Sequence, residues 1–352
     1  MKSWRFGAAL LAVIVLLASC APPVASPTAP AEPTAAAPAP AAGGEAVTVG
    51  LVMKSLANEF FKVMGEGTEA WAATRPDIAL TMVGMNSETD IDTQISAVEN
   101  FVTQKQDLIV LAPADSVGLV PSVKKALDAG ITVVNFDVRL DPQALTEAGL
   151  QDFLFVGPDN AEGAKLAGDA LGQALGAGGK VIIIEGNPGA DNATQRKNGF
   201  MQSVEEYDLE LLDSVTAHWE TEEANTVMTN LLTKYPDVQG VMAANDSMAL
   251  GIVKALDAAG KSGEVLVVGF DNIPAVQPLL ENGKMLATID QFGPDMAKNA
   301  IEIGLRVLAG EDLSGWIKTP VKLVTAADLG AAPAPAAGGE AVTVGLVMKS
   351  LA

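Results

Sequence analysis

Residues 239–260 read QGVMAANDSMALGIVKALDAAG and show in one place the pattern that runs through the whole chain. The short apolar run QGVMAAN (239–245) predicts a buried strand, and the apolar spacing of SMALGIVKALDAAG predicts a helix packed against it. Asn245 and Asp246 stand between the two, where a polar side chain either caps the helix or faces a ligand. A strand followed directly by a covering helix is the unit from which parallel sheets are built.

The same alternation extends from this unit in both directions. Ten further apolar runs predict strands: VTVGLVM (47–53), IALTMVG (78–84), DLIVLAP (107–113), ITVVNFD (131–137), FLFVG (153–157), KVIIIEG (180–186), LLDSVTA (211–217), EVLVVGF (264–270), MLATID (285–290) and VKLVT (321–325). Runs with helical spacing, such as AEGAKLAGDALGQAL, lie between most of them. The pattern predicts an α/β protein whose parallel sheets are covered on both faces, and eleven strands suit two sheets better than one.

The N-terminal residues have the features of an export signal. Lys2 and Arg5 precede an apolar run (6–18) that is too short to span a bilayer comfortably. The segment LASC (17–20) resembles the cleavage box of bacterial lipoproteins, in which the signal is cut before a cysteine that then carries lipid. We expect a signal peptide over 1–19, lipidation of Cys20, and an extended Ala/Pro-rich linker over 20–45. The alternative is an ordinary signal peptide with an incidental cysteine.

The C-terminal segment is an internal duplication. Residues 331–352 repeat residues 36–57 letter for letter, AAPAPAAGGEAVTVGLVMKSLA, but lack the helix that follows the first copy. The first copy is therefore expected to occupy the fold and the second to form a loose tail. We expect its deletion to leave ligand affinity unchanged.

Composition excludes several functions. The net charge is −21, from 43 acidic against 22 basic residues, which argues against binding to nucleic acid phosphates. Cys20 is the only cysteine and His218 the only histidine, so a Cys-rich or multi-His metal site and a Cys–His nucleophile pair are impossible. The chain also lacks an Asp-x-Asp-x-Asp calcium loop, and we expect neither a metal nor a cofactor.

Polar residues gather just after the predicted strands, where ligands bind in open parallel sheets. They are amides, carboxylates and cations with a few aromatics: Lys54, Asn58, Phe60, Phe61, Asp137, Arg139, Asn192, Arg196, Trp219, Asn245, Asp271 and Gln291. A sugar needs this mixture, because each hydroxyl both donates and accepts a hydrogen bond and aromatic rings can cover its C–H faces. Taken singly, the aromatics could equally belong to the core, and either Asn245 or Asp246 could simply cap a helix.

Seven segments together resemble the ribose- and galactose-type periplasmic binding proteins, the type I sugar-binding family of uptake transporters. They are LVMKSLANEFF (51–61), APADSVG (112–118), VVNFD (133–137), RKNGF (196–200), PDVQGVMAANDSMALG (236–251), VLVVGFDN (265–272) and MLATIDQ (285–291). The resemblance runs in order from about residue 47 to 325. It implies two Rossmann-like lobes joined by a three-segment hinge, with the ligand in the cleft between them.

Mapped onto this chain, the resemblance places the N-terminal lobe at 46–158 with 292–318 and the C-terminal lobe at 159–291 with 319–330. It implies that Asn58, Asp137, Arg196, Asn245, Asp271 and Gln291 bind hydroxyls while Phe60, Phe61 and Trp219 contact the sugar ring. Four departures from the family pattern leave a different pentose, a hexose or a sugar alcohol as compatible as ribose. Val138 replaces the family arginine with Arg139 one place later, Lys54 replaces a small hydroxyl residue, Ala57 and Glu59 replace the family's Asn and Pro around Asn58, and a longer segment (140–152) follows Arg139.

These features predict a non-enzymatic, exported and lipid-anchored monomer that captures a monosaccharide or sugar alcohol for an ABC transporter permease. One alternative is a receptor that presents its ligand to a chemoreceptor or sensor kinase. A second is a secreted glycoside hydrolase using Asp137 and Asp271, but neighbouring Arg and amide groups are expected to keep both acids ionised, whereas a general acid needs a raised pKa. A transcriptional sensor of the related repressor family is excluded by the export signal.

Overall fold

The computed structural model describes residues 45–330. The predicted signal peptide, Cys20, almost all of the linker and the duplicated tail lie outside these residues. No helix within residues 45–330 is long and apolar enough to cross a membrane.

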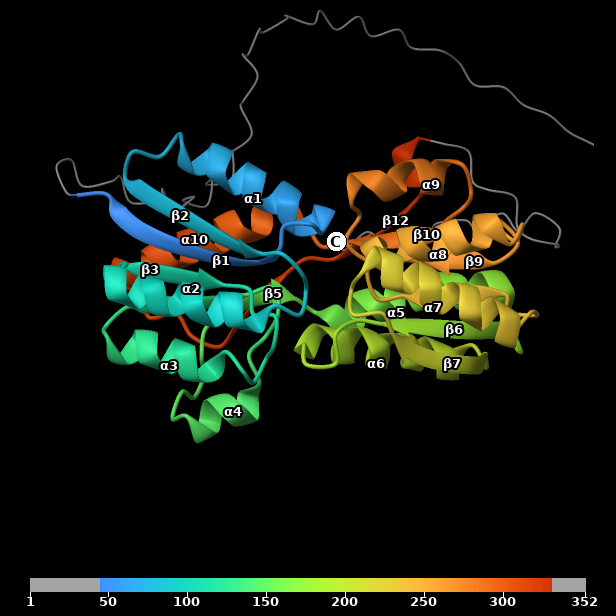
Figure 1. The fold of residues 1–352 in the computed structure, drawn as a ribbon, viewed down its shortest axis with the longest axis horizontal. Helices are drawn as coiled ribbons and strands as arrows, with labels where there is room; N and C mark the ends of the chain where they lie inside the picture. The colour runs from blue at the N-terminus through green and yellow to red at the C-terminus, as the bar shows by residue number, and fades with distance from the viewer. Residues whose placement is uncertain (1–44, 331–352) are drawn as a thin grey trace, which may run out of the picture. The chain divides into compact units, whose positions relative to one another are not determined.

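Two six-stranded sheets organise the described chain (Figure 1). The first has the order β11-β5-β4-β3-β1-β2, and all its neighbouring strands pair in parallel. Its strands are β1 (Val47–Ser55), β2 (Ile78–Met85), β3 (Leu108–Leu111), β4 (Thr132–Phe136), β5 (Phe155–Pro158) and β11 (Trp316–Thr319).

The second sheet has the order β12-β10-β9-β8-β6-β7, and only its β12–β10 pair is antiparallel. Its strands are β6 (Lys180–Glu185), β7 (Glu210–Thr216), β8 (Gly240–Ala243), β9 (Leu266–Val268), β10 (Ala287–Asp290) and β12 (Lys322–Thr325). The α/β prediction with two mainly parallel sheets is confirmed.

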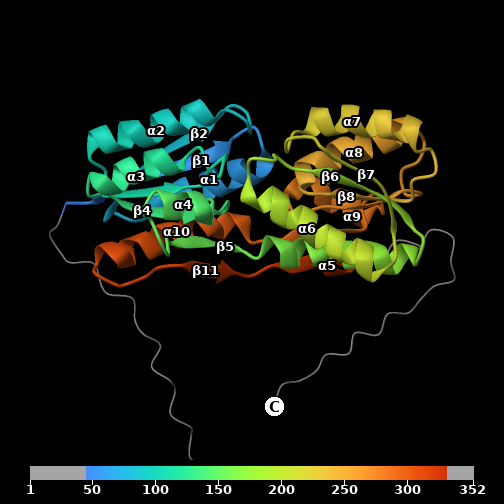
Figure 2. The same cartoon turned by 90° about the horizontal axis from the view of Figure 1, so that it is seen from below.

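Helices flank both sheets (Figure 2). They are α1 (Glu59–Ala72), α2 (Ile91–Gln104), α3 (Val120–Asp128), α4 (Pro142–Glu147), α5 (Asn160–Leu175), α6 (Asp191–Glu206), α7 (Thr221–Lys234), α8 (Asp246–Ala258), α9 (Gln277–Glu281) and α10 (Gly293–Leu308), with two short 3₁₀ turns, η1 (Pro274–Val276) and η2 (Ala326–Leu329). Below, the first lobe is the first sheet with α1–α4 and α10, and the second lobe is the second sheet with α5–α9.

The near-continuous apolar strands follow from burial of both sheet faces. In β3, Leu108 and Val110 face a core that includes Met64 of α1 and Met296 of α10. The alternate residues of the same strand face a separate core with α2 and α3. Since successive side chains of a strand point to opposite faces, a strand buried on both faces must be apolar at every position.

The chain passes between the sheets at three places. These are the connections from β5 to α5, from β10 to α10 and from β11 to β12. At the second of them, Phe292 adopts a left-handed backbone with φ 57° directly before α10. The residue bounds of the lobes given above remain a prediction.

The sequence-based prediction missed several elements, among them β11 and the short helix α4. β11 has only four residues, WIKT, none of them fully buried, so no apolar run marks it. It becomes a strand through its parallel pairing with β5, a contact that lies far away in the sequence. The short helix α4 lies in the longer segment after Arg139 and begins with Asp141 as its N-cap and Pro142 in its first turn.

Candidate ligand-binding site

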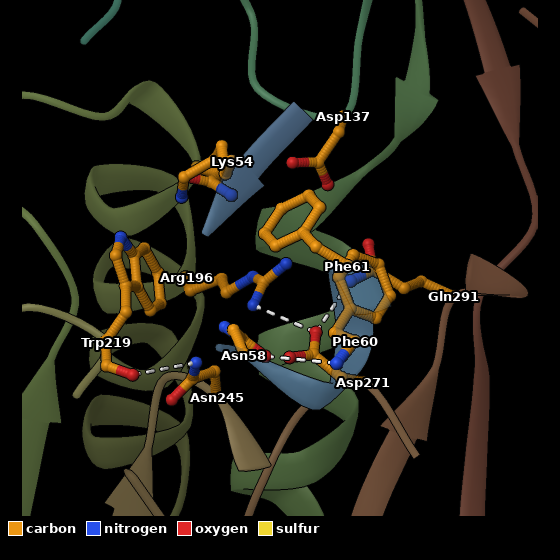
Figure 3. Close-up of a pocket in the computed structure, with 11 residues that line it drawn as sticks. Lys54, Asn58, Phe60, Phe61, Asp137, Arg196, Trp219, Asn245, Asp271 and Gln291 are labelled. Atoms are coloured by element: carbon orange, nitrogen blue, oxygen red, sulfur yellow. Dashed lines mark hydrogen bonds and ion pairs between the residues drawn. The ribbon is translucent and has the colours of Figure 1, made fainter. Parts of the chain in front are cut away.

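Eleven side chains from both lobes line one cavity (Figure 3). They are Lys54, Asn58, Phe60, Phe61, Asp137, Asn192, Arg196, Trp219, Asn245, Asp271 and Gln291, and all were predicted from the strand ends. The space between their atoms is about 250 Å³.

Three of these residues adopt a backbone that side chains rarely take. Asp137, Trp219 and Asp271 have φ values of 62°, 70° and 118°. Main-chain hydrogen bonds hold the two aspartates in place, from the N–H of Asp137 to Val156 and from the N–H of Asp271 to Ile289, at 3.1 and 2.7 Å. Such conformations cost on the order of 1–3 kcal/mol each and cluster at ligand sites, where the surrounding structure fixes them.

Arg196 lies in the second lobe at the centre of the cavity, between Trp219 and Asp271 (Figure 3). Its Nε donates to Asn160 and one terminal nitrogen donates to the carbonyl of Ala244, both at 2.8 Å. The same nitrogen lies 3.4 Å from Asp271, and the guanidinium carbon is 3.6 Å from the centre of the Phe270 ring. The guanidinium is thus fixed before a ligand arrives, which reduces the entropy lost on binding.

Four buried polar atoms of the cavity residues have no hydrogen-bond partner within residues 45–330. Asp137 Oδ2, Asn192 Oδ1 and Gln291 Oε1 are acceptors, and Trp219 Nε1 is a donor. A buried polar atom without a partner costs about 1–3 kcal/mol. The cavity therefore favours a ligand that donates several hydrogen bonds and accepts at least one, which is the chemistry of a polyol.

Burial dominates the ionisation of the two cavity aspartates. It raises the pKa of Asp137 to about 6, although Lys54 and Arg196 oppose the rise. It raises the pKa of Asp271 to about 7, again against the charge of Arg196. The flanking cations and amides therefore do not prevent the pKa of either acid from rising, because desolvation outweighs them.

The aromatic residues bridge the core and the site. Phe60 and Phe61 meet edge to face, with ring centres 5.0 Å apart, and both line the cavity while belonging to the hydrophobic core. Trp219 also does both. Its ring covers Gly186, where a Cβ atom would come within 2.1 Å of the indole. The core interpretation and the ligand interpretation of these residues are thus compatible.

Asn245 and Asp246 turn out to have different structural roles. Asn245 is the N-cap of α8, and its Oδ1 accepts from the N–H of Met248 at 2.9 Å. Asp246 accepts from Thr288 and from the N–H of Ile273, so it fastens the second lobe internally and does not line the cavity.

Arg139 is the one predicted site residue that the structure places elsewhere. The amide of Asn135 donates to the carbonyl of Val138 at 2.7 Å and turns the chain so that Val138 is buried. The next side chain then points away from the cavity, and the Arg139 guanidinium lies 5.8 Å from the centre of the Trp316 ring. The one-residue offset from the family pattern therefore corresponds to a different location.

Glu88 is a residue that the sequence-based prediction missed. It stands three residues beyond the end of β2, and this position after a strand is the signal that could have pointed to it. Its Oε2 lies 2.9 Å from Lys54 Nζ, and its Oε1 accepts from Asn58 Nδ2 at 3.0 Å. Glu88 does not line the cavity itself, but it contacts two residues that do.

Direct hydrogen bonds join the two lobes around the cavity. Ser247 donates to Asn58 Oδ1, and the N–H of Glu88 donates to Glu220, both at 3.1 Å. Elsewhere the N–H of Ser116 donates to the carbonyl of Gly189, and the N–H of Asp191 donates to Ser116 Oγ, both at 2.9 Å. The lobes are thus closed over the cavity.

Comparisons with known proteins agree with this site. A profile of the periplasmic binding protein domain matches residues 49–312. A D-ribose/D-allose-binding protein of Pseudomonas aeruginosa is 46% identical over 79% of this chain and 88% of that protein. A D-allose-binding periplasmic protein of Escherichia coli is 35% identical over 76% of this chain and 85% of that protein. A solved solute-binding protein of an ABC transporter from Actinobacillus succinogenes, with bound D-allose, is 39% identical, covers 80% of this chain and 98% of that chain, and has a TM-score of 0.76.

The chain belongs to the periplasmic binding protein family. Members of this family are exported solute-binding proteins, not enzymes, and the relatives named above carry names or a bound ligand that identify them as binders of D-ribose or D-allose. The predicted family, fold and non-enzymatic class are confirmed, and the hydrolase alternative falls away.

Proposed function

We propose that this protein captures one monosaccharide or sugar alcohol between its lobes and delivers it to an ABC transporter permease. The observation that carries the proposal is a group of buried polar atoms that have no hydrogen-bond partner among the described residues: three acceptors and one donor facing the cavity. Ligand hydroxyls can donate to Asp137, Asn192 and Gln291, and one can accept from Trp219. Phe60 and Phe61 supply apolar surface for the C–H groups of the ring.

D-Allose and D-ribose are the first ligands to test, because relatives named for them are 46% and 35% identical to this chain. Lys54 adds donors that a small hydroxyl residue could not supply. Its Nζ lies 2.9 Å from Glu88 Oε2. An ammonium carries three N–H donors, so others remain for the ligand, which favours a sugar with an additional hydroxyl, such as a hexose.

Ligand binding is expected to stabilise closure. A ligand shifts the equilibrium between open and closed lobes only by its difference in affinity for the two forms. Asp137 from the first lobe and Arg196 and Asp271 from the second reach the same ligand only when the lobes are closed. The closed form is the one that we expect the permease to recognise.

Isothermal titration of the purified protein with D-allose, D-ribose, other pentoses and hexoses, inositol and linear polyols tests the ligand class. We expect tight one-to-one binding of one sugar or polyol and weaker binding of its deoxy analogues. An Asp312→Asn variant, which removes a charge from an exposed site, serves as the matched control. Absence of heat with every compound would refute the proposed ligand class.

The membrane tether and the oligomeric state are part of the same proposal. We infer that Cys20 carries lipid, that residues 20–45 space the domain from the membrane, and that the protein acts as a monomer. Fractionation of cells expressing Cys20→Ala is expected to release the protein from the membrane. A variant that stays in the membrane fraction would refute lipidation at this residue.

A further inference from the structure

Glu88 stands out among the charged residues near the site because it is almost fully buried yet lies outside the cavity. Its side chain is 1% exposed. Both of its oxygens contact cavity residues of its own lobe: Lys54 Nζ at 2.9 Å and Asn58 Nδ2 at 3.0 Å. A buried carboxylate in this position supplies the negative charge that a buried ammonium needs.

The same residue also touches the other lobe. The main-chain N–H of Glu88 donates to Glu220 Oε1 at 3.1 Å, directly before α7. Asn58, which Glu88 holds through its Nδ2, accepts from Ser247 of the second lobe through its Oδ1. Two hydrogen bonds that join the lobes therefore involve Glu88 closely: its own main chain makes one, and Asn58, which its side chain binds, makes the other.

We propose that Glu88 is a positioning residue, which fixes Lys54 and Asn58 for the ligand and makes their placement depend on closure of the lobes. The proposal rests on the proposed sugar-binding function and adds a residue that acts without touching the sugar. When the lobes open, the hydrogen bonds from Glu88 to Glu220 and from Ser247 to Asn58 break, and the loop that carries Glu88 loses its contact with the second lobe. The first lobe then presents Lys54 less firmly, so closure and correct ligand contact reinforce each other.

The surroundings of Lys54 explain why this fixing matters. Its Nζ lies 5.4 Å from the centre of the Phe61 ring and 5.3 Å from that of Trp219, so aromatic faces border the ammonium. Its charge also acts on Asp137 and Asp271. Without Glu88, we expect Lys54 to turn toward these carboxylates and to occupy the acceptors that the sugar needs.

A double-mutant cycle tests the coupling. In Glu88→Gln the acceptor for Asn58 remains while the charge opposite Lys54 is lost, and we expect a roughly 10- to 100-fold lower sugar affinity. In a Lys54→Met background the same change is expected to cost less than about 3-fold, because Glu88 acts through Lys54. An equal loss in both backgrounds, or no loss in the first, would overturn the proposal.

The link to closure is tested by stopped-flow binding kinetics. Glu220→Ala is expected to speed dissociation about 3- to 10-fold and to leave association unchanged, since the lost bond exists only in the closed form. Glu222→Ala removes the same charge two residues away, where Glu222 pairs with exposed Lys254, and is expected to change neither rate. An unchanged dissociation rate in Glu220→Ala would refute the link between Glu88 and closure of the lobes. Because this variant leaves the Glu88 side chain unaltered, it tests the proposal even if Glu88→Gln fails to fold. If the unaltered protein bound no sugar, the proposed function would fail instead.

Discussion

Replacing Asp137 by Asn separates ligand binding from folding stability. Burial raises the pKa of this carboxyl from 3.8 to about 6, so its ionised form destabilises the ligand-free fold at pH 7.5 by about 3 kcal/mol. The neutral amide of Asn removes this destabilisation, but its buried N–H₂ group lowers the free energy of unfolding by about 1–2 kcal/mol. We expect the ligand-free variant to be more stable than the unaltered protein by about 1–2 kcal/mol.

The same substitution removes a charged acceptor from the site. Asp137 Oδ2 has no donor within residues 45–330, so a ligand hydroxyl is its expected partner. Hydrogen bonds to charged groups contribute roughly 1.5–3 kcal/mol, which corresponds to a loss of affinity of about 10- to 150-fold. The variant should therefore melt a few degrees higher without ligand and gain much less from added sugar.

Differential scanning calorimetry and isothermal titration measure the two effects on one sample, with Asp312→Asn as the control for net charge. A lower melting temperature of ligand-free Asp137→Asn would show that the carboxylate stabilises the fold. Unchanged affinity would show that it does not face the ligand. Either result would refute the assignment of Asp137.

Three further predictions concern the site and its closure. Sugar affinity is expected to fall as pH decreases from 8 to 5.5, because ligand hydroxyls donate better to ionised than to protonated cavity aspartates. The stability of the ligand-free fold is expected to fall in the other direction, as pH rises from about 4 through the raised pKa values of Asp137 and Asp271. Isothermal titration and thermal melting across this pH range check both trends, and an affinity independent of pH would contradict the first. Gly189→Ala places a Cβ within 2.2 Å of Asp115 Oδ2 in the other lobe, so sugar affinity should drop without a change in ligand-free melting temperature, whereas Gly67→Ala on α1, whose nearest new contact is 3.8 Å, should leave affinity unchanged. Trp219→Phe removes the Nε1 donor and should weaken sugar binding about 3- to 10-fold. If Trp219 contacts the ligand, the variant should also lose the change in tryptophan fluorescence that the ligand induces. A change that persists in the variant would come from another tryptophan.

The sequence predicted the strands well because the information is local. All eleven predicted strands exist. Central strands such as β3 are buried on both faces and need an unbroken apolar run. β11 could not be found in this way. Its residues Trp316–Thr319 are half-exposed at the edge of a sheet, and only pairing with β5 makes them a strand.

Most site residues were predictable because they follow strands, whereas the location of Arg139 was not. Parallel strands end at one edge, so polar residues after each strand converge, and eleven of those named line one cavity. Where the chain turns within a loop, this rule gives no direction. Arg139 follows such a turn, stabilised by Asn135, and its side chain points toward Trp316. The raised pKa values of Asp137 and Asp271 also depend on burial of their side chains in the folded protein, which strand positions do not reveal.

The chain crosses repeatedly between the two sheets and adds one strand to each near residue 320, which has a consequence for folding during synthesis. The first sheet gains its outer strand β11, and the second gains β12, only from residues 316–325, after almost all the rest of the chain. Neither lobe can complete its sheet before residues 316–325 have been synthesised. Because such long-range pairings form slowly, the chain should remain incompletely folded until these residues have left the ribosome, a state that suits passage through a secretion channel.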